Sequence, residues 1–164
     1  MSHFYLPIHE ERIREVALRR LPAEIPAERV PLEAEVAVTK EPVPWADRLK
    51  LEYRPIGKGE RWGGAFECGW FHVTGQVPKA WKGAYVTLNL DFGGESCVFD
   101  AKGCPLVGLT NGCAFLDGYR KDHFHWLPKA KGGERIDFWV EAGANDMFGV
   151  KRLADPAAAG VPLA

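Results

Sequence analysis

Two segments of this chain alternate apolar and polar residues with a period of two. They cover residues 85–92 and 135–141, and their apolar positions are Val86, Leu88, Leu90, Phe92, Ile136, Phe138 and Val140. Successive side chains of a strand point to opposite faces, so this period predicts two half-buried strands, each with one face toward a core. Shorter or less regular patterns predict four further strands, over residues 66–77, 96–100, 106–109 and 123–127.

Turn signals rich in glycine separate these predicted strands. They are Gly93-Gly94, Lys102-Gly103, Asn111-Gly112 and Gly132-Gly133. Many short strands with regularly spaced turns indicate an antiparallel β-sandwich or jelly roll. Strands do not alternate with helices along the chain, so a parallel sheet is not expected. The predicted fold class is therefore mainly β, with one N-terminal helix.

The predicted helix covers residues 8–21. Four apolar residues fall near helical spacing among charged neighbours, namely Ile13, Val16, Ala17 and Leu21. Acidic residues in the first turn and basic residues in the last would suit the helix dipole. Pro7 suits the start of a helix and Pro22 ends it. Such a helix cannot bury its apolar stripe alone, so we expect it to dock on the domain or on another part of a larger protein.

The pattern divides the chain into three parts. Residues 1–60 form the helix and a proline-rich extended arm, residues 61–150 form the β-sandwich core, and residues 151–164 form a linker-like tail rich in alanine and proline. Within the arm, residues 34–38 and 49–53 are candidates for edge strands, where nearby proline is tolerated.

Composition excludes several classes of protein. The 164 residues are 46% hydrophobic and 26% charged, and 21 basic against 22 acidic residues give a formal charge of -1. This balance, with no basic stripe, argues against nucleic acid as a partner. No apolar segment approaches the roughly 20 residues that span a bilayer, so no membrane partner is expected. The four cysteines, without a C-x-x-C pair or an export signal, favour reduced thiols and a cytoplasmic location; they are Cys68, Cys97, Cys104 and Cys113.

Residues that could carry chemistry give weak signals. The acidic candidates for a glycosidase-type carboxylate pair stand in no catalytic motif, so no catalytic residue is assigned; they are Glu67, Asp91, Glu95, Asp100 and Asp146. On a strand, His123 and His125 would share one face. Two surface histidines opposite a buried Phe124 are the favoured interpretation, because a metal site needs a third ligand. We therefore predict no metal and no cofactor in this chain.

Aromatic residues are the other candidates for ligand binding, since the chain has six tryptophans. Trp70, next to Phe71, is predicted to lie in the core. Trp62 and Trp81 adjoin turn residues and are predicted at an edge, where exposed rings can stack on sugars. They are the candidate carbohydrate-binding residues, although packing within the domain is the favoured interpretation for both.

A series of motifs runs in order from Trp62 to Gly149. It consists of Trp62-Gly63, Trp70-Phe71-His72-Val73-Thr74-Gly75, Val77-Pro78-Lys79-Ala80-Trp81, Gly94-Glu95-Ser96-Cys97-Val98-Phe99-Asp100, Pro105-Leu106-Val107-Gly108-Leu109-Thr110-Asn111-Gly112 and Glu141-Ala142-Gly143-Ala144-Asn145-Asp146-Met147-Phe148-Gly149. In this order the motifs resemble the N-terminal β-domain of α-mannosidases of glycoside hydrolase family 38, in the cytosolic and bacterial branch.

The resemblance implies a galactose-binding-like β-sandwich that belongs to a larger enzyme. Such an enzyme would hydrolyse α-mannosidic bonds with retention, with a divalent metal, usually zinc, in a catalytic barrel downstream. No position of this chain matches the metal ligands or the aspartate nucleophile of that barrel. The resemblance thus implies a non-catalytic domain whose partner is the catalytic domain of the same polypeptide.

Two alternatives remain from the sequence. The chain could be a free-standing carbohydrate-binding module with a mannoside as ligand, or a structural protein-interaction domain. In the family, further strand sequence follows the motif at residues 145–149, whereas here an alanine- and proline-rich stretch follows. Either the sandwich lacks its last strand or the sequence stops early. A missing strand would leave an exposed edge, which could pair with another copy in a homo-oligomer.

Overall fold

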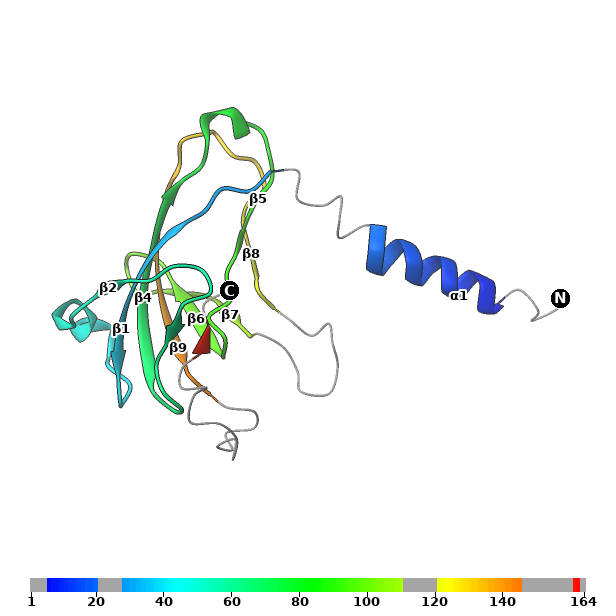
Figure 1. Ribbon diagram of the computed structural model, residues 1–164. Helices are drawn as coiled ribbons and strands as arrows, with labels where there is room; N and C mark the ends of the chain where they lie inside the picture. The colour runs from blue at the N-terminus through cyan, green and yellow to red at the C-terminus, as the bar shows by residue number, and fades with distance from the viewer. Residues whose placement is uncertain (1–5, 21–27, 111–120, 146–160, 163–164) are drawn as a thin grey trace. The chain divides into compact units, whose positions relative to one another are not determined.

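The computed structural model describes residues 6–20, 28–110, 121–145 and 161–162 (Figure 1). The chain divides into two compact units, Met1–Pro31 and Leu32–Ala164. The first unit holds helix α1 (Leu6–Glu15) and the π-helix η2 (Val16–Arg20), and the second holds all the described strands. Among the described residues, no helix has the length and apolar content of a membrane span.

The N-terminal helix is confirmed, with an earlier start than predicted. Because α1 begins at Leu6, its first turn contains no acidic residue, and the predicted acidic first turn is wrong. Arg12 and Arg14 lie in the last turn of α1, where their charge is favourable beside the carbonyl end of the helix. Large apolar side chains of this unit are exposed, namely Ile8, Ile13, Val16 and Leu18.

Six strands form one antiparallel sheet in the order β2-β1-β4-β9-β6-β7. Their bounds are β1 Glu33–Thr39, β2 Arg54–Pro55, β4 Cys68–Gln76, β6 Ser96–Phe99, β7 Pro105–Leu109 and β9 Arg135–Gly143. At its centre β4 pairs with β9 along its whole length, from Cys68 opposite Gly143 to Gln76 opposite Arg135. Strands distant in the sequence therefore meet in the middle of the sheet.

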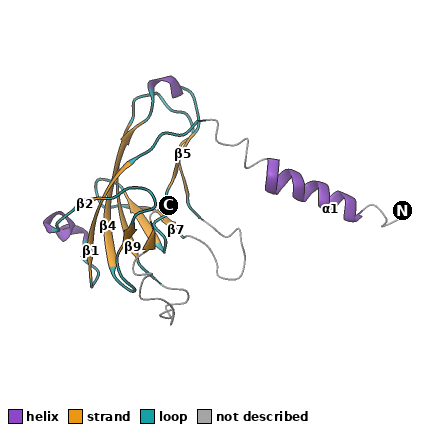
Figure 2. Ribbon diagram, viewed as in Figure 1, coloured by secondary structure: helices purple, strands orange, loops and turns teal. Residues whose placement is uncertain are grey.

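Two short two-stranded sheets complete the unit (Figures 1 and 2). In one, β5 (Val86–Asn89) pairs with β8 (His123–Leu127), and in the other β3 (Arg61–Trp62) pairs with β10 (Val161–Pro162). The predicted fold class, mainly antiparallel β with one short helical segment at the N-terminus, is confirmed. Six predicted strands match β4 to β9 within a few residues at either end.

The core lies between the six-stranded sheet and the β5–β8 ribbon, by which we mean these two paired strands. On the sheet side the alternation places Phe71, Val98 and Val140 inward, and all three are fully buried. Val86 and Leu88 of β5 face them from the ribbon side of the same cluster. Burying one such side chain stabilises the fold by about 1.5–3 kcal/mol relative to leaving it exposed. Trp70 and Phe71 are both buried, as predicted.

A second aromatic cluster covers part of the outer face of the sheet. The 3-10 helix η3 (Trp45–Lys50) places Trp45 against Trp70 and Trp139, with ring centroids 5.8 and 6.4 Å apart. Trp139, which the alternation placed on the polar side of its strand, is thereby buried. The tryptophan Nε1 of Trp70 donates a hydrogen bond of 2.8 Å to the carbonyl of Val43, which holds the preceding loop in place.

The arm preceding residue 61 differs from its prediction. Strand β1 lies between β2 and β4, so it is not the edge strand that residues 34–38 were predicted to form. The predicted strand over 49–53 is wrong, because η3 occupies residues up to Lys50. The turns of η3 are closed by backbone hydrogen bonds, which the N–H of Asp47 donates to Pro44 and the N–H of Leu51 to Arg48. The β unit thus begins at Leu32, whereas the predicted sandwich core begins at residue 61.

The predicted tail also differs in part. Val161 lies opposite Trp62 and Pro162 opposite Arg61, so the end of the tail contributes strand β10. Residues 151–160 of that tail, and the predicted Asn111-Gly112 turn, lie outside the described residues.

Candidate functional site

Trp62 lies in the core and not at an exposed edge as predicted. Its side chain is 1% exposed, and its Nε1–H donates a hydrogen bond of 3.0 Å to the carbonyl of Phe92. Its ring meets Phe71 edge-on at 5.0 Å. A Cβ at Gly69 would stand 2.7 Å from the Trp62 ring, so the glycine makes room for it. In this conformation no sugar ring can lie against Trp62.

Trp81 is half-buried at one end of the core. It closes the 3-10 helix η4 (Lys79–Trp81), which lies between β4 and β5, and its ring packs against the core cluster. The turn is held by backbone bonds from Trp81 to Pro78 and from Ala84 to Trp81. The structure therefore does not join Trp62 and Trp81 in one exposed aromatic surface, and the packing interpretation fits both positions better.

An exposed polar face occurs instead on the outside of the β5–β8 ribbon. Alternation on β5 turns Thr87 and Asn89 outward, and the adjoining Tyr85 is 58% exposed. Register pairs Thr87 with His125 and Asn89 with His123, so both histidines lie on the same outer face. We call this surface the ribbon face; it consists of Tyr85, Thr87, Asn89, Asp122, His123 and His125.

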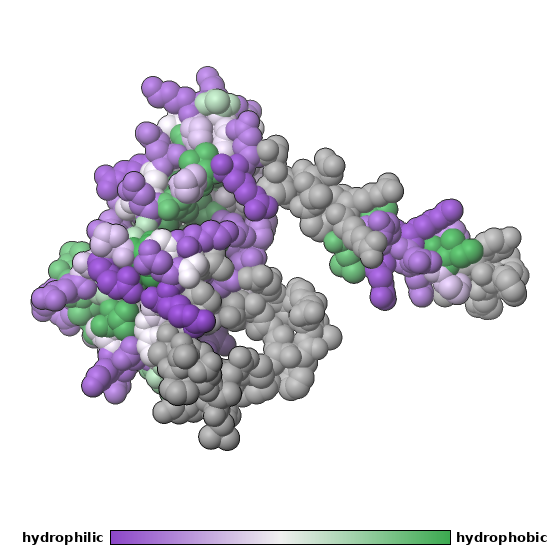
Figure 3. All heavy atoms as spheres, viewed as in Figure 1, coloured by the Kyte–Doolittle hydropathy of each residue, from purple (hydrophilic) through white to green (hydrophobic). Residues whose placement is uncertain are grey.

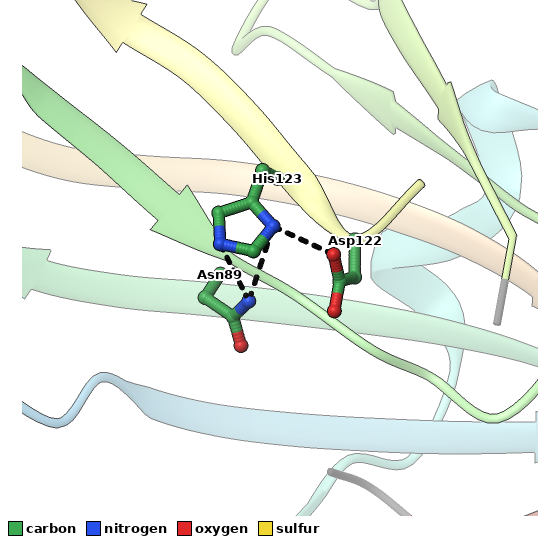
Figure 4. A network of polar contacts seen from close by, with 3 residues as sticks. All are labelled: Asn89, Asp122 and His123. Atoms are coloured by element: carbon green, nitrogen blue, oxygen red, sulfur yellow. Dashed lines mark hydrogen bonds and ion pairs between the residues drawn. The ribbon is translucent and has the colours of Figure 1, made fainter. Parts of the chain in front are cut away.

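Polar contacts hold one end of the ribbon face in a defined arrangement (Figure 4). The Asp122 carboxylate lies 2.6 Å from Nδ1 of His123, and the Asn89 amide nitrogen lies 3.2 Å from Nε2 of the same ring. With Nδ1–H donating to Asp122, Nε2 accepts from Asn89, and this assignment satisfies both bonds. The carbonyl oxygen of Asn89 points away from the His123 ring (Figure 4).

The other end of the ribbon face is aromatic. The Tyr85 and His125 rings lie 5.9 Å apart at 54°. Behind them, Phe124 and Trp126 turn inward and meet Phe138 edge-on at 5.5 and 5.3 Å. The prediction of two surface histidines around an inward-facing Phe124 is thus confirmed. Among the residues that the structure describes, no three His, Cys, Asp or Glu side chains gather in a way that could hold a metal ion.

The described acidic candidates hold loops in place. Glu67 accepts a hydrogen bond from the backbone N–H of Gly64, and Asp91 accepts one from the backbone N–H of Gly93. Asp100 accepts two, from the backbone N–H groups of Lys102 and Cys104. These backbone donors, led by Cys104, lower the pKa of Asp100. Glu95 accepts from the side chain of Asn145 at 2.7 Å. Asp146 lies outside the described residues, as does Cys113.

The outer face of the six-stranded sheet carries a buried cation. The Arg48 guanidinium lies 3.4 Å from the ring centroid of Trp45 and 4.5 Å from that of Trp139. It also donates to the Trp45 carbonyl at 2.8 Å. Burial lowers the pKa of Arg48 and raises the pKa of nearby Tyr53 to about 12, so the cluster keeps one fixed charge at physiological pH. We interpret it as a structural cap on the sheet.

Beside this cap, Glu141 is half-buried in the same outer face. Register places it opposite Trp70 on one side and Cys97 on the other. Burial raises the pKa of Glu141, and burial together with this carboxylate raises the pKa of Cys68 and Cys97. Both cysteines are free, as is exposed Cys104. The raised pKa makes Cys68 and Cys97 poor nucleophiles.

An open cleft of about 670 Å³ lies at the β1 end of the outer face. Its polar lining is Glu33, Glu35, Glu60, His72 and Thr74. His72 stacks on Trp139 at 4.3 Å and contacts Asp137 at 2.9 Å, so its ring is held at the cleft wall. Beyond the cleft, hydrophilic residues predominate on the viewed face of the β unit, with smaller hydrophobic patches between them (Figure 3).

These two packed antiparallel layers, without an assembled catalytic or metal centre among the described residues, define a β-domain of jelly roll type. Residues 29–161 match the family described as "Alpha-mannosidase, jelly roll domain". The chain belongs to this family. The predicted resemblance to an α-mannosidase β-domain is thereby confirmed.

Two relatives extend this finding. Alpha-mannosidase G of Dictyostelium discoideum is 29% identical over 119 residues, which cover 73% of this chain and 11% of that protein. Alpha-mannosidase 2C1 of Homo sapiens is 33% identical over 73 residues, which cover 44% of this chain and 7% of that protein. The chain thus spans only about a tenth of the length of these relatives.

Sequence reasoning did not find the ribbon face as a candidate site. The alternation of residues 85–92 already separated Tyr85, Thr87 and Asn89 from the apolar positions. The missing information was the pairing of β5 with β8, which places His123 and His125 beside them. A search for two alternating segments with complementary polar sides would have suggested this surface.

Proposed function

We propose that this chain is the non-catalytic jelly roll domain of a larger α-mannosidase and that it packs on the catalytic domain of the same polypeptide. The observation that carries the proposal is the extent of the match. The family covers residues 29–161, nearly all of the β unit, whereas the aligned parts amount to 11% and 7% of the two relatives. The remainder of such an enzyme would hold the chemistry that hydrolyses α-mannosidic bonds.

The acidic side chains support a non-catalytic role. Glu67, Asp91, Asp100 and Glu95 each accept hydrogen bonds that fix a loop. A glycosidase needs two carboxylates that are free to reach a substrate from opposite sides. In this proposal a divalent metal, zinc by the resemblance, belongs to the catalytic domain and not to this chain.

Exposed apolar side chains support a packing role. The N-terminal unit leaves Ile8, Ile13, Val16 and Leu18 uncovered, and the β unit exposes Val38, Phe66 and Leu106. An amphipathic helix gains most of its stability from packing of its apolar face. We propose that α1 docks on the remainder of the enzyme. The free thiols of Cys68, Cys97 and Cys104 fit a reducing compartment such as the cytoplasm.

Two measurements test this proposal. Tryptic peptides of this chain from its source cell should elute with a protein several times larger than 18.2 kDa. In a second test, the chain and the remainder of that polypeptide are expressed as separate proteins. We expect them to co-purify, and hydrolysis of an aryl α-mannoside should require the remainder and not this chain alone.

A double variant of the helix sharpens the second test. Ile13→Asp with Leu18→Asp should weaken co-purification, while Arg12→Lys with Arg14→Lys, on the same helix, should leave it unchanged. A native product that runs near 18.2 kDa would overturn the proposal, as would separate chains that never associate.

A further inference from the structure

We propose that the ribbon face binds a neutral sugar chain, with the ring of Tyr85 as a stacking platform and Asn89 and His123 as hydrogen-bonding groups. The surface lies apart from the tryptophans that the sequence suggested. The choice of an α-mannoside as the sugar rests on the proposed function; the location of the site does not.

The aromatic end of the ribbon face provides an accessible apolar plane. Tyr85 is 58% exposed, and the neighbouring His125 ring lies 5.9 Å away at 54°, so the two rings form an angled surface. Sugar rings present C–H groups on one side, and covering an exposed aromatic ring with them removes apolar area from water.

The polar end provides directed hydrogen bonds. Asp122 fixes the His123 ring through Nδ1, and Asn89 contacts the same ring with its amide nitrogen. The Asn89 carbonyl oxygen lies on the side of the amide away from the His123 ring (Figure 4), and the amide nitrogen carries a second N–H besides the one at Nε2. One acceptor and one donor on a planar amide can serve two neighbouring hydroxyl groups of a pyranose.

The ribbon supports these groups rigidly and sets their spacing. Val86 and Leu88 on its inner face are buried, and Phe124 and Trp126 pack on Phe138 behind the histidines. Along the strand, residue 85 and residue 89 are separated by about 13 Å, because each residue advances the chain by about 3.3 Å. This span exceeds one pyranose ring, so the surface fits a chain of at least two sugar units.

The ribbon face carries little net charge. Asp122 is its one carboxylate, and the exposed Lys121 next to it is the nearest cation. The choice of a neutral ligand therefore rests on the exposed ring of Tyr85 and the amide of Asn89. Hydroxyl-rich, uncharged sugars remain the class that stacking and amide hydrogen bonds recognise.

The test is a titration of the ¹⁵N-labelled full chain with an α-linked mannotriose, followed through the amide resonances. We expect shifts in residues 85–89 and 121–125 and a Kd in the millimolar range, as befits an open surface. Tyr85→Ala should raise Kd at least about fivefold, whereas Tyr85→Phe, which keeps the ring, should change it less than about twofold. Leu106→Ala, which removes a 43% exposed side chain from β7, is the control and should leave Kd unchanged.

Asn89→Ala gives an independent measure of the polar end and should also raise Kd several-fold. A β-linked glucose trimer of the same length tests the choice of sugar. If it binds as tightly as the mannotriose, the assignment of an α-mannoside is overturned. If the glucose trimer binds more weakly, the assignment is supported. No amide shifts with mannotriose, or shifts confined to other residues, would overturn the site. Tyr85→Ala and Asn89→Ala alter none of the apolar side chains proposed for packing, so we expect co-purification with the catalytic part to be unchanged by them, and the two proposals can fail separately.

Discussion

Trp62 and Tyr85 are both aromatic residues beside turns, yet their side chains are 1% and 58% exposed. The difference arises from contacts far along the chain. The Nε1–H of Trp62 reaches the carbonyl of Phe92, thirty residues away, and Gly69 leaves space for its ring. Tyr85 lies on the polar side of an alternating segment, and its ring lies 5.9 Å from that of His125. Residue type alone therefore did not identify the exposed ring.

We predict that truncation of Trp62 strongly destabilises the fold. Trp62→Ala should lower the free energy of unfolding by about 3–5 kcal/mol, because it leaves a cavity against Phe71. Trp62→Phe should lower it by about 1–3 kcal/mol, since the buried Phe92 carbonyl loses its donor. Urea unfolding measures both, with Tyr85→Ala as a surface control expected within about 0.5 kcal/mol of wild type. Equal effects of Trp62→Ala and Tyr85→Ala would contradict this assignment.

Glu141 gives a prediction about pH. Burial raises its pKa in the folded chain, so the folded state holds the proton to a higher pH than the unfolded state. Stability from this group therefore falls as pH rises from the ordinary glutamate range through the raised pKa. Glu141→Gln removes this loss and should stabilise the protein at pH 7 by less than about 1 kcal/mol, because solvent screens a half-buried group.

The same variant should show no gain below about pH 4, where glutamate is protonated in both states. Thermal melts between pH 3.5 and 7.5 provide the measurement. Glu52→Gln, at an exposed position after η3, is the matched control. A gain for Glu141→Gln that stays constant over this range would show that its effect is not electrostatic.

At the scale of elements, periodicity predicted strands well and their surroundings poorly. The alternation of residues 135–141 identifies β9, with Phe138 and Val140 on its buried side. It also places Trp139 on the outer side, correctly, but cannot show that η3 covers that side with Trp45 and Arg48. A 3-10 helix has three residues per turn, and η3 is only six residues long. It is therefore too short to produce a periodic hydrophobic pattern in the sequence. Covering elements of this kind become visible only with tertiary structure.

Close packing between two elements leads to a prediction for Gly94. A Cβ at this position would stand 2.2 Å from the carbonyl oxygen of Gly143, where the β5–β6 turn crosses the end of β9. Because both sides of this contact are backbone, Gly94→Ala should destabilise the protein by about 2–3 kcal/mol. Gly108→Ala on β7, whose nearest atom lies 3.8 Å away, is the control and should change stability by less than about 1 kcal/mol.

Guanidinium unfolding compares the two glycine variants directly. A loss in Gly94→Ala no larger than in Gly108→Ala would show that the turn shifts easily to admit a methyl group. A larger loss of stability in Gly94→Ala than in Gly108→Ala would explain why the turn after residue 92 needs a glycine at its second position. This glycine was identified from the sequence only as a turn signal.

At the scale of the whole molecule, the strand order shows a long-range pairing that the predicted division of the chain at residue 60 did not include. Prolines between residues 22 and 55 suggested an extended arm, and they do confine β2 to two residues. Yet β1 pairs with β4 from Glu33 opposite Thr74 to Thr39 opposite Cys68. Its partner lies about 35 residues downstream, so no local pattern connects them. The two-layer fold class could be predicted from turns and alternation, whereas this long-range pairing could not.

Truncation tests this organisation. Residues 28–164 retain Leu32, which packs against the core, and all of β1, but they lack α1. Since α1 belongs to a separate unit, this shorter chain should keep its antiparallel circular-dichroism spectrum and melt within about 3 °C of the full chain. Residues 61–164 lose β1, β2 and η3 together. Their loss exposes the edge of β4, removes the buried Val36 and Ile56, and uncovers Trp139.

For residues 61–164 we therefore expect no cooperative thermal transition and an aggregated peak in size-exclusion chromatography, because an uncovered edge strand invites pairing with other chains. Identical tags and buffers make the two truncations comparable. A sharp melt for residues 61–164 would mean that the arm is dispensable and that the boundary near residue 60 is correct. A failure of residues 28–164 to fold would mean that α1 stabilises the β unit itself, and its proposed docking on the catalytic domain would then lose its main support.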